Sequence, residues 1–201
     1  MTIAATSAQA EPVVVAALGD SLTAGYGLDT ADGLVPQLQR WLDAQGAEVT
    51  VINAGLSGDT TAGGLARVDW TLTDDVDGMI VALGANDYLR GLPPTLVRDN
   101  LDGILAAAKA KGVATLLVGL DVGANYGADY KAEFDAIYPD LSKTHDVPLV
   151  PSFFAALIEE AGQEGLLGYL QGDGLHPTAE GVAVIVAALG PAVLDFAEGI
   201  E

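Results

Sequence analysis

Short apolar runs alternate with longer amphipathic segments from Pro12 to the end of the chain. This alternation is typical of βα units arranged around a mainly parallel sheet. Most of the runs are nearly continuous, as expected for strands that helices cover on both faces. The pattern therefore predicts an α/β fold built as a three-layer sandwich. The strands are expected at Val13 to Leu18, Glu48 to Asn53, Gly78 to Leu83, Ala114 to Leu120 and Pro148 to Val150.

Five segments between and after these runs carry apolar residues at helical spacing. They are the segment marked by Leu34, Leu38, Trp41 and Leu42, and the segments Leu96 to Lys111, Asp129 to Thr144, Phe153 to Ala161 and Ala179 to Phe196. Thr178 is expected to cap the last helix, because a threonine hydroxyl at this position accepts a hydrogen bond from the first turn.

The chain of 201 residues has the length of one compact domain, and no linker, repeat or charge block divides it. We expect one domain over residues 12–201, with residues 1–11 outside it. Ala8-Gln9-Ala10 has the small-x-small form of a signal-peptidase site, which indicates a trimmed export signal and a periplasmic or secreted protein. An alanine-rich start with a chance match explains the same residues equally well.

The composition is strongly acidic, with 28 Asp plus Glu against 8 Lys plus Arg and a formal net charge of -20. Such a surface repels phosphate backbones, so no nucleic acid partner is expected. The longest apolar runs, such as residues 182–189, are shorter than the roughly 18 residues that cross a bilayer, so no integral membrane segment is expected. Without cysteine and with two histidines, the chain can form no disulfide and lacks the ligands of a structural zinc site.

Further polar residues are interpreted as structural. Asp20, Asp59 and Asp87 each follow a strand beside Gly or Asn, where aspartates commonly fix turns, so no metal is expected there. His145 falls at the end of a helix, where the dipole favours a cation, and is interpreted as a surface histidine. No G-x-G-x-x-G sequence or phosphate loop occurs, and no cofactor is expected.

The residues at the expected strand ends and just before the last expected helix include a possible nucleophile, a base and a carboxylate partner for that base. Ligands of open parallel sheets bind beyond the carboxyl ends of the strands, so side chains there can meet. His176 can take a proton from Ser21, and Asp173 can hold the imidazole in the required tautomer. The backbone N–H groups of Ser21 and Gly58 and the side-chain amide of Asn86 can donate to a developing oxyanion. Together these residues predict acyl transfer.

Four sequence blocks resemble those of the SGNH, or GDSL, hydrolases. They are Gly19-Asp20-Ser21-Leu22, Ser57-Gly58-Asp59-Thr60, Gly84-Ala85-Asn86-Asp87 and Asp173-Gly174-Leu175-His176-Pro177. The resemblance covers about residues 13–198. Within the family the chain is most similar to the bacterial periplasmic thioesterase, arylesterase and lysophospholipase branch, through Leu65-Ala66-Arg67, Leu89-Arg90-Gly91 and Ala124-Asn125-Tyr126-Gly127.

This resemblance implies a flavodoxin-like fold with a five-stranded parallel sheet and helices on both faces. It also implies Ser21 as nucleophile and first oxyanion donor, Gly58 and Asn86 as the other donors, His176 as base and Asp173 as its partner.

We therefore expect a serine esterase that hydrolyses carboxylic esters through an acyl-enzyme intermediate, with aryl esters of short to medium acyl chains as substrates. Acyl thioesters and lysophospholipids are additional substrates that the resemblance suggests. Two alternatives stay open: a carbohydrate O-deacetylase of the same fold, and a protein that binds a small ligand without reacting. The sequence does not determine the oligomeric state.

Two loops after the expected strands are candidates for binding the acyl chain. Leu89 and Leu92 offer apolar contact in the segment 88–94, and Tyr126 does so in the segment 123–127. An ordinary connection with two buried leucines is the alternative for the first loop.

Overall fold

The computed structural model describes residues 12–200, except for the side chains of residues 163 and 164. Its centre is a five-stranded sheet in the order β2-β1-β3-β4-β5, and all neighbouring strands are parallel. The strands are β1 (Val13–Gly19), β2 (Val49–Gly55), β3 (Gly78–Ala82), β4 (Ala114–Val118) and β5 (Leu149–Val150). The expected parallel sheet is thereby confirmed. The expected export-signal remnant within residues 1–11 lies outside the described residues.

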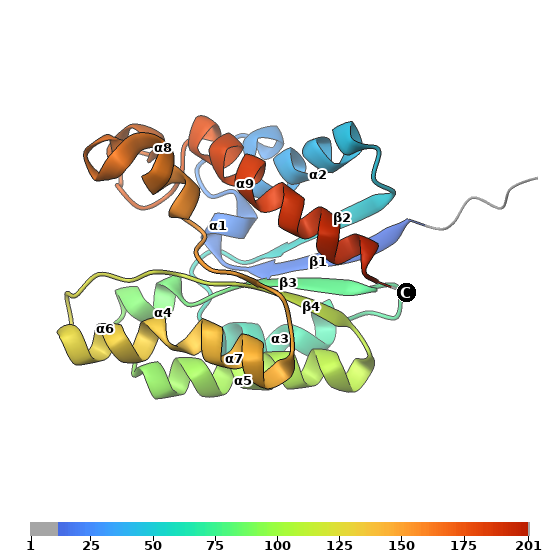
Figure 1. The fold of residues 1–201 in the computed structure, drawn as a ribbon, viewed down its shortest axis with the longest axis horizontal. Coiled ribbons are helices and arrows are strands. Elements are labelled where there is room, and N and C mark those ends of the chain that lie inside the picture. Colours follow the sequence, from blue (N-terminus) through green and yellow to red (C-terminus); the bar gives the residue numbers. More distant parts are fainter. Residues whose placement is uncertain (1–11, 201) are drawn as a thin grey trace, which may run out of the picture.

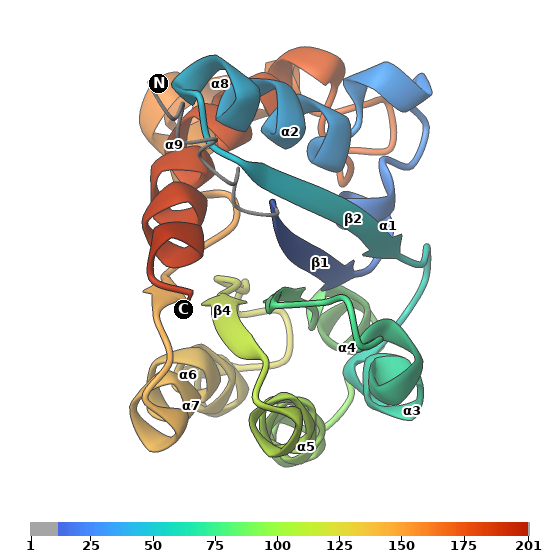
Figure 2. The same ribbon diagram turned by 90° about the vertical axis from the view of Figure 1, so that its right-hand side faces the viewer.

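Helices cover both faces of this sheet (Figure 1). One layer contains α1 (Ser21–Ala24), α2 (Leu34–Gln45), α8 (Ala155–Gly165) and α9 (Ala179–Glu198). The other contains α3 (Thr61–Thr71), α4 (Ala85–Leu89), α5 (Pro94–Lys111), α6 (Ala128–Asp135) and α7 (Ile137–His145). Two short 3₁₀ helices, Thr30–Asp32 and Leu166–Tyr169, lie in the connections before α2 and after α8. Figure 2 shows the three layers nearly end-on and confirms the expected sandwich.

The central strand β1 divides its side chains between two hydrophobic clusters. Val15 and Ala17 pack with α2 and α9, whereas Ala16 and Leu18 pack with α3 and α5 on the opposite face. All four residues are buried. This explains why the strand is continuously apolar, because successive side chains of a strand point to opposite faces and both faces are covered here.

The last helix, α9, begins as expected after Thr178, whose hydroxyl accepts a hydrogen bond from the Gly181 N–H at 3.1 Å. With 20 residues, it is the one described helix long and apolar enough to cross a membrane, a test that core helices also pass. Ile185, Leu189 and Val193 are buried against the sheet and α2. This packing is that of a core helix, which explains its apolar composition.

The helix expected from Asp129 to Thr144 is two helices, α6 and α7, that meet at Ala136. The interruption follows from Pro139 in the first turn of α7, because proline has no N–H to donate to the carbonyl of Asp135 four residues earlier. The prediction of one continuous helix was wrong here.

Three helices were not predicted: α1, α3 and α4. α3 has eleven residues, but Gly63 and Gly64 in its first turn weaken the sequence signal for a helix. Gly64 is required by close packing, since a Cβ atom at this position would lie 2.3 Å from the Leu83 side chain. Gly64 therefore weakens the helix signal in the sequence and at the same time lets α3 pack closely against Leu83.

His145 is the last residue of α7, as expected, but it is not a surface histidine. Its side chain is 11% exposed, and Nε2 lies 2.7 Å from Asp102 Oδ1 of α5. The imidazole links two helices on one face of the sheet.

Candidate active site

Three neighbouring strands end at the same level of the sheet. Gly19, the last residue of β1, lies beside Gly55 of β2 and Ala82 of β3. Because the strands are parallel, the segments that follow them leave the sheet along one edge. A fourth segment, residues 170–178, reaches this edge from the far end of the chain and is tied to it by a hydrogen bond from Gln171 Nε2 to the carbonyl of Tyr26. Four segments distant in sequence therefore meet here.

Ser21, His176 and Asp173 form a continuous chain of hydrogen bonds. Ser21 Oγ lies 2.8 Å from His176 Nε2, and His176 Nδ1 lies 2.6 Å from Asp173 Oδ2. Ser21 is the first residue of α1, directly after β1, and the other two residues lie just before α9. The ring of Tyr26 lies 4.5 Å from the imidazole, centroid to centroid. The structure thus brings together the three residues expected to form a catalytic triad.

The carboxylate of Asp173 is fixed by three donors. Besides the imidazole, its Oδ1 accepts hydrogen bonds from the backbone N–H groups of Leu175 and His176. The bond to His176, followed by these two backbone bonds, lowers the pKa of Asp173 to about 2. The residue is therefore ionised at neutral pH, and an ionised carboxylate at Nδ1 favours the imidazole tautomer that has its proton on Nδ1 and its acceptor, Nε2, facing Ser21 Oγ.

The expected oxyanion donors line the same pocket as Ser21. Gly58 lies in the loop between β2 and α3 with φ of +82°, a conformation that residues with a side chain rarely adopt. Asn86 is the second residue of α4, whose N-terminus follows β3. The backbone of Ser21, the backbone of Gly58 and the amide of Asn86 thus come from three adjacent strand ends.

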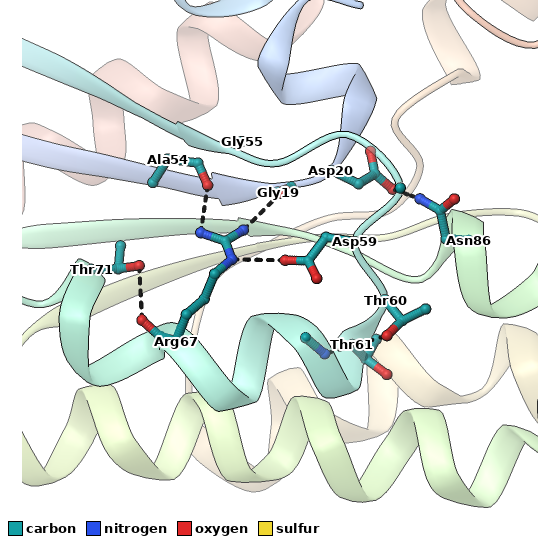
Figure 3. A network of polar contacts seen from close by, with 12 residues as sticks. Gly19, Asp20, Ala54, Gly55, Asp59, Thr60, Thr61, Arg67, Thr71 and Asn86 are labelled. Atoms are coloured by element: carbon teal, nitrogen blue, oxygen red, sulfur yellow. Dashed lines mark hydrogen bonds and ion pairs between the residues drawn. The ribbon is translucent and has the colours of Figure 1, made fainter.

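Asp20 is a fully buried carboxyl group beside the nucleophile. Its Oδ1 accepts from the backbone N–H of Leu22, and its Oδ2 accepts from Asn86 Nδ2 at 3.2 Å, as Figure 3 shows for Asn86. Burial outweighs these hydrogen bonds and raises the pKa of Asp20 to about 6. The contact with Asn86 connects the turn after β1 to the N-terminus of α4.

A pocket of about 410 Å³ opens at Ser21. Its walls are mainly apolar and come from every segment at this edge of the sheet. The side chains that give it this character are Leu22, Tyr26, Leu89, Leu120, Phe154 and Leu175. A larger cavity of about 710 Å³ lies near His145 and is lined by none of the triad or oxyanion residues. The pocket at Ser21 is therefore the candidate substrate site.

The structure brings one of the three expected substrate-binding residues into this pocket. Leu89 lines it, whereas Leu92 and Tyr126 do not. Leu92 is half-buried, and its carbonyl accepts a hydrogen bond from Tyr130. Tyr126 packs edge-on against Tyr88, and its hydroxyl donates to the carbonyl of Leu89. Both residues support the loop that carries Leu89.

Several pocket residues were not predicted, namely Leu22, Tyr26, Leu120, Phe154 and Leu175. Leu22 and Leu175 lie inside the sequence blocks that carry the catalytic residues, so their position was a usable signal. Phe154 gave none, because it precedes α8 and reaches the site only through the tertiary fold.

The described residues include no group of three or more His, Cys, Asp or Glu side chains that could hold a metal ion. The three aspartates at the strand ends have separate partners. Asp20 accepts from Asn86, Asp59 pairs with Arg67, and Asp87 accepts from the backbone N–H and hydroxyl of Thr61. Each carboxylate therefore has protein partners of its own.

The arrangement around Ser21 is that of a serine hydrolase site. The serine is hydrogen-bonded to a histidine, the histidine is hydrogen-bonded to a carboxylate, and amide N–H groups lie beside the serine. The GDSL-like lipase/acylhydrolase family model matches residues 17–184, and the chain belongs to this family.

Two curated relatives and a solved structure show how closely the chain resembles characterised members. Esterase TesA of Pseudomonas aeruginosa is 36% identical over 84% of this chain and 82% of the relative. An arylesterase of Vibrio mimicus is 37% identical over 89% and 86%, respectively. The crystal structure of AlinE4, an SGNH-hydrolase family esterase, superposes with a TM-score of 0.75 at 41% identity, over 94% of this chain and 98% of that one.

Proposed function

We propose that this protein is a serine esterase in which Ser21 is the nucleophile, His176 the general base and Asp173 the residue that orients and stabilises the imidazole. In the first step, Ser21 Oγ attacks the ester carbonyl carbon while its proton moves to His176 Nε2. The carbonyl electron pair moves to oxygen. The N–H groups of Ser21, Gly58 and Asn86 then stabilise the negative charge on this oxygen.

Collapse of this intermediate breaks the bond to the alcohol oxygen, which takes the proton from His176 and leaves. Ser21 stays acylated. A water molecule then gives a proton to His176 and attacks the acyl carbon, and the second intermediate collapses to release the carboxylic acid and return the proton to Ser21. The cycle needs no cofactor, because the protein supplies both the nucleophile and the proton carrier.

The observation that supports this proposal best is the hydrogen-bonded chain Ser21–His176–Asp173 at the opening of an apolar pocket. Its test is covalent labelling with a fluorophosphonate, followed by peptide mass spectrometry. We expect one label per chain, at Ser21, and no label or turnover in Ser21→Ala. Ser57→Ala is the matched control, because Ser57 lines the same pocket. Labelling at Ser57, or binding of esters without labelling, would contradict the proposal, and the latter would favour the small-ligand binding protein.

For the substrates, we propose carboxylic esters with short to medium acyl chains and an aryl or alkyl alcohol. The supporting observations are the volume of the pocket and its apolar walls. Relatives named arylesterase and thioesterase 1/protease 1/lysophospholipase L1 add thioesters and lysophospholipids to the candidates. Turnover of a panel of p-nitrophenyl esters, an acyl thioester, a lysophospholipid and acetylated xylan separates these classes, and preference for the xylan would indicate the O-deacetylase.

The preference for acyl chain length can be tested by substituting two leucines, Leu89 and Leu92. Leu89→Ala should reduce kcat/KM for an octanoate ester more than for an acetate ester, at about 0.8 kcal/mol per methylene no longer buried. Leu92→Ala is the matched control and should affect both esters equally, because Leu92 does not line the pocket. Equal losses in Leu89→Ala would show that the acyl chain lies elsewhere.

We further propose that the protein acts in the periplasm or after secretion. The support is the sequence Ala8-Gln9-Ala10, which has the form of a signal-peptidase site. Fractionation of cells that express the full chain, with immunodetection in each fraction, tests this. Retention in the cytoplasm would refute it.

A further inference from the structure

Two of the four arginines of this acidic chain donate hydrogen bonds to Gly58 or to its neighbour Asp59. We propose that Arg67 and Arg90 are positioning residues that hold the Gly58 loop, residues 56–60, so that the Gly58 N–H points to the oxyanion. The inference rests on the proposed function, because it assigns a role within the same site. Neither guanidinium lines the pocket at Ser21.

Arg67 joins three chain segments with one guanidinium group. From the middle of α3, it donates from Nη2 to the carbonyl of Gly19 at 2.9 Å and from Nη1 to the carbonyl of Ala54 at 2.8 Å. Its Nε donates to Asp59 Oδ2 at 2.7 Å. Figure 3 shows these three bonds spreading from the guanidinium to the ends of β1 and β2 and to the Gly58 loop.

These contacts engage all three nitrogens of the Arg67 guanidinium. A guanidinium is planar and has donors on three nitrogens in fixed directions, whereas a lysine ammonium is a single point charge. The Asp59 side chain is 8% exposed and that of Arg67 is 23% exposed, so the ion pair is largely shielded from water. Arg67 therefore sets where Asp59, the neighbour of Gly58, stands relative to the strand that leads to Ser21.

Arg90 binds the loop at Gly58 itself. It is the C-cap residue of α4, the helix that carries Asn86, and its Nη2 donates to the carbonyl of Gly58 at 2.7 Å. The contact is a direct link between the segments of two oxyanion donors. Arg67 and Arg90 together connect the segments of all three donors, Ser21, Gly58 and Asn86.

The Gly58 peptide groups need such support, because among the described residues the bond from Arg90 is the one hydrogen bond made to them. Gly58 is exposed and adopts φ of +82°. The ends of the loop are held by other bonds: the Leu56 N–H donates to the carbonyl of Gly19, the Asp59 N–H donates to the carbonyl of Leu56, and Thr60 accepts from the N–H groups of Gly63 and Gly64 in α3. Glycine has more conformational freedom than any other residue, so its N–H keeps one direction only if its neighbours are fixed. A donor aids catalysis to the extent that it is already oriented before charge develops.

The test compares Arg90→Gln and Arg67→Lys with Arg98→Gln as the matched control. Arg98 forms an ion pair with Asp140 between α5 and α7, away from the pocket. Active sites are first counted by fluorophosphonate titration, so that partly unfolded protein does not count as slow enzyme. Turnover of p-nitrophenyl acetate and inhibition by a trifluoromethyl ketone, which Ser21 converts to a tetrahedral oxyanion, are then measured per active site.

We expect kcat per active site to fall by about 10-fold to 10²-fold in Arg90→Gln, with a much smaller change in KM, because a misdirected donor affects mainly the charged intermediate. The inhibition constant of the ketone should rise in proportion to the loss in kcat/KM. Arg67→Lys should behave similarly, and Arg98→Gln should match the wild type. If both site variants melt at lower temperature but keep wild-type kcat per active site, the arginines only stabilise the fold and the inference is wrong. Absence of labelling in the wild type would instead refute the proposed function.

Discussion

Replacing Asp20 with Asn tests two effects of this carboxylate separately: its effect on kcat, through the orientation of Asn86, and its effect on the free energy of unfolding. Asp20 is completely buried, and its two oxygens accept from the Leu22 N–H and from Asn86 Nδ2. A carboxylate only accepts hydrogen bonds, so it forces the NH₂ group of Asn86 towards itself and leaves the second hydrogen of that group for the oxyanion. An asparagine at position 20 has one acceptor oxygen for two donors.

The magnitude follows from the pKa of Asp20. Burial raises it from 3.8 to about 6, so the folded protein holds this proton more tightly than the unfolded chain does. The contribution of the group to the free energy of unfolding is therefore greatest below pH 3.8 and decreases as the pH rises through 6. About two pKa units correspond to about 3 kcal/mol, at about 1.36 kcal/mol per unit.

The assay is urea denaturation of the wild type and Asp20→Asn at a series of pH values. Groups common to both proteins cancel in the difference between their free energies of unfolding. We expect this difference to shift in favour of Asp20→Asn by up to about 3 kcal/mol between about pH 4 and pH 7, and to stay constant above that range. The variant should also lose kcat, because Asn86 is no longer held in one orientation. A difference that does not vary with pH would refute the reasoning.

Three further predictions concern the site and the surface. Asn86→Ala should lower kcat by about 10²-fold to 10³-fold with a smaller effect on KM in steady-state kinetics, and an unchanged kcat would remove Asn86 from the oxyanion hole. Thr178→Ala should lower the free energy of unfolding in urea by about 1 kcal/mol, since the α9 cap is lost, whereas Thr178→Ser should retain most of it. Sodium chloride should raise the melting temperature over the first few hundred millimolar by screening the net charge of -20, and a steady fall would contradict self-repulsion.

Sequence patterns predicted the sheet well because the three inner strands, β1, β3 and β4, are covered on both faces and are apolar almost throughout. Every expected strand is present, and the ends differ by two residues or fewer. That Ser21, Gly58 and Asn86 lie together could be predicted for a related reason, since each follows a strand and parallel strands place their carboxyl ends at one edge of the sheet.

Other features depend on contacts that no local pattern contains. α3 has two glycines in its first turn, Gly63 beside the Asp59 side chain and Gly64 beside that of Leu83. Positions 89 and 92 are both leucine and belong to the same loop, yet of these two only Leu89 lines the pocket. The difference lies in the course of the loop, which Tyr126 and Tyr130 fix from another segment.

The negative and the positive side chains at the active-site edge of the sheet contact different kinds of oxyanion donor. Among the described residues, no cation forms a hydrogen bond or ion pair with Asp20, although a cation beside a buried carboxylate would lower the cost of its charge. An arginine there would take the place of Asn86 as hydrogen-bond donor and leave the amide free to rotate. The two arginines near the site instead bind main-chain carbonyls and Asp59. The unpaired carboxylate thus orients a side-chain donor, and the cations orient a main-chain donor.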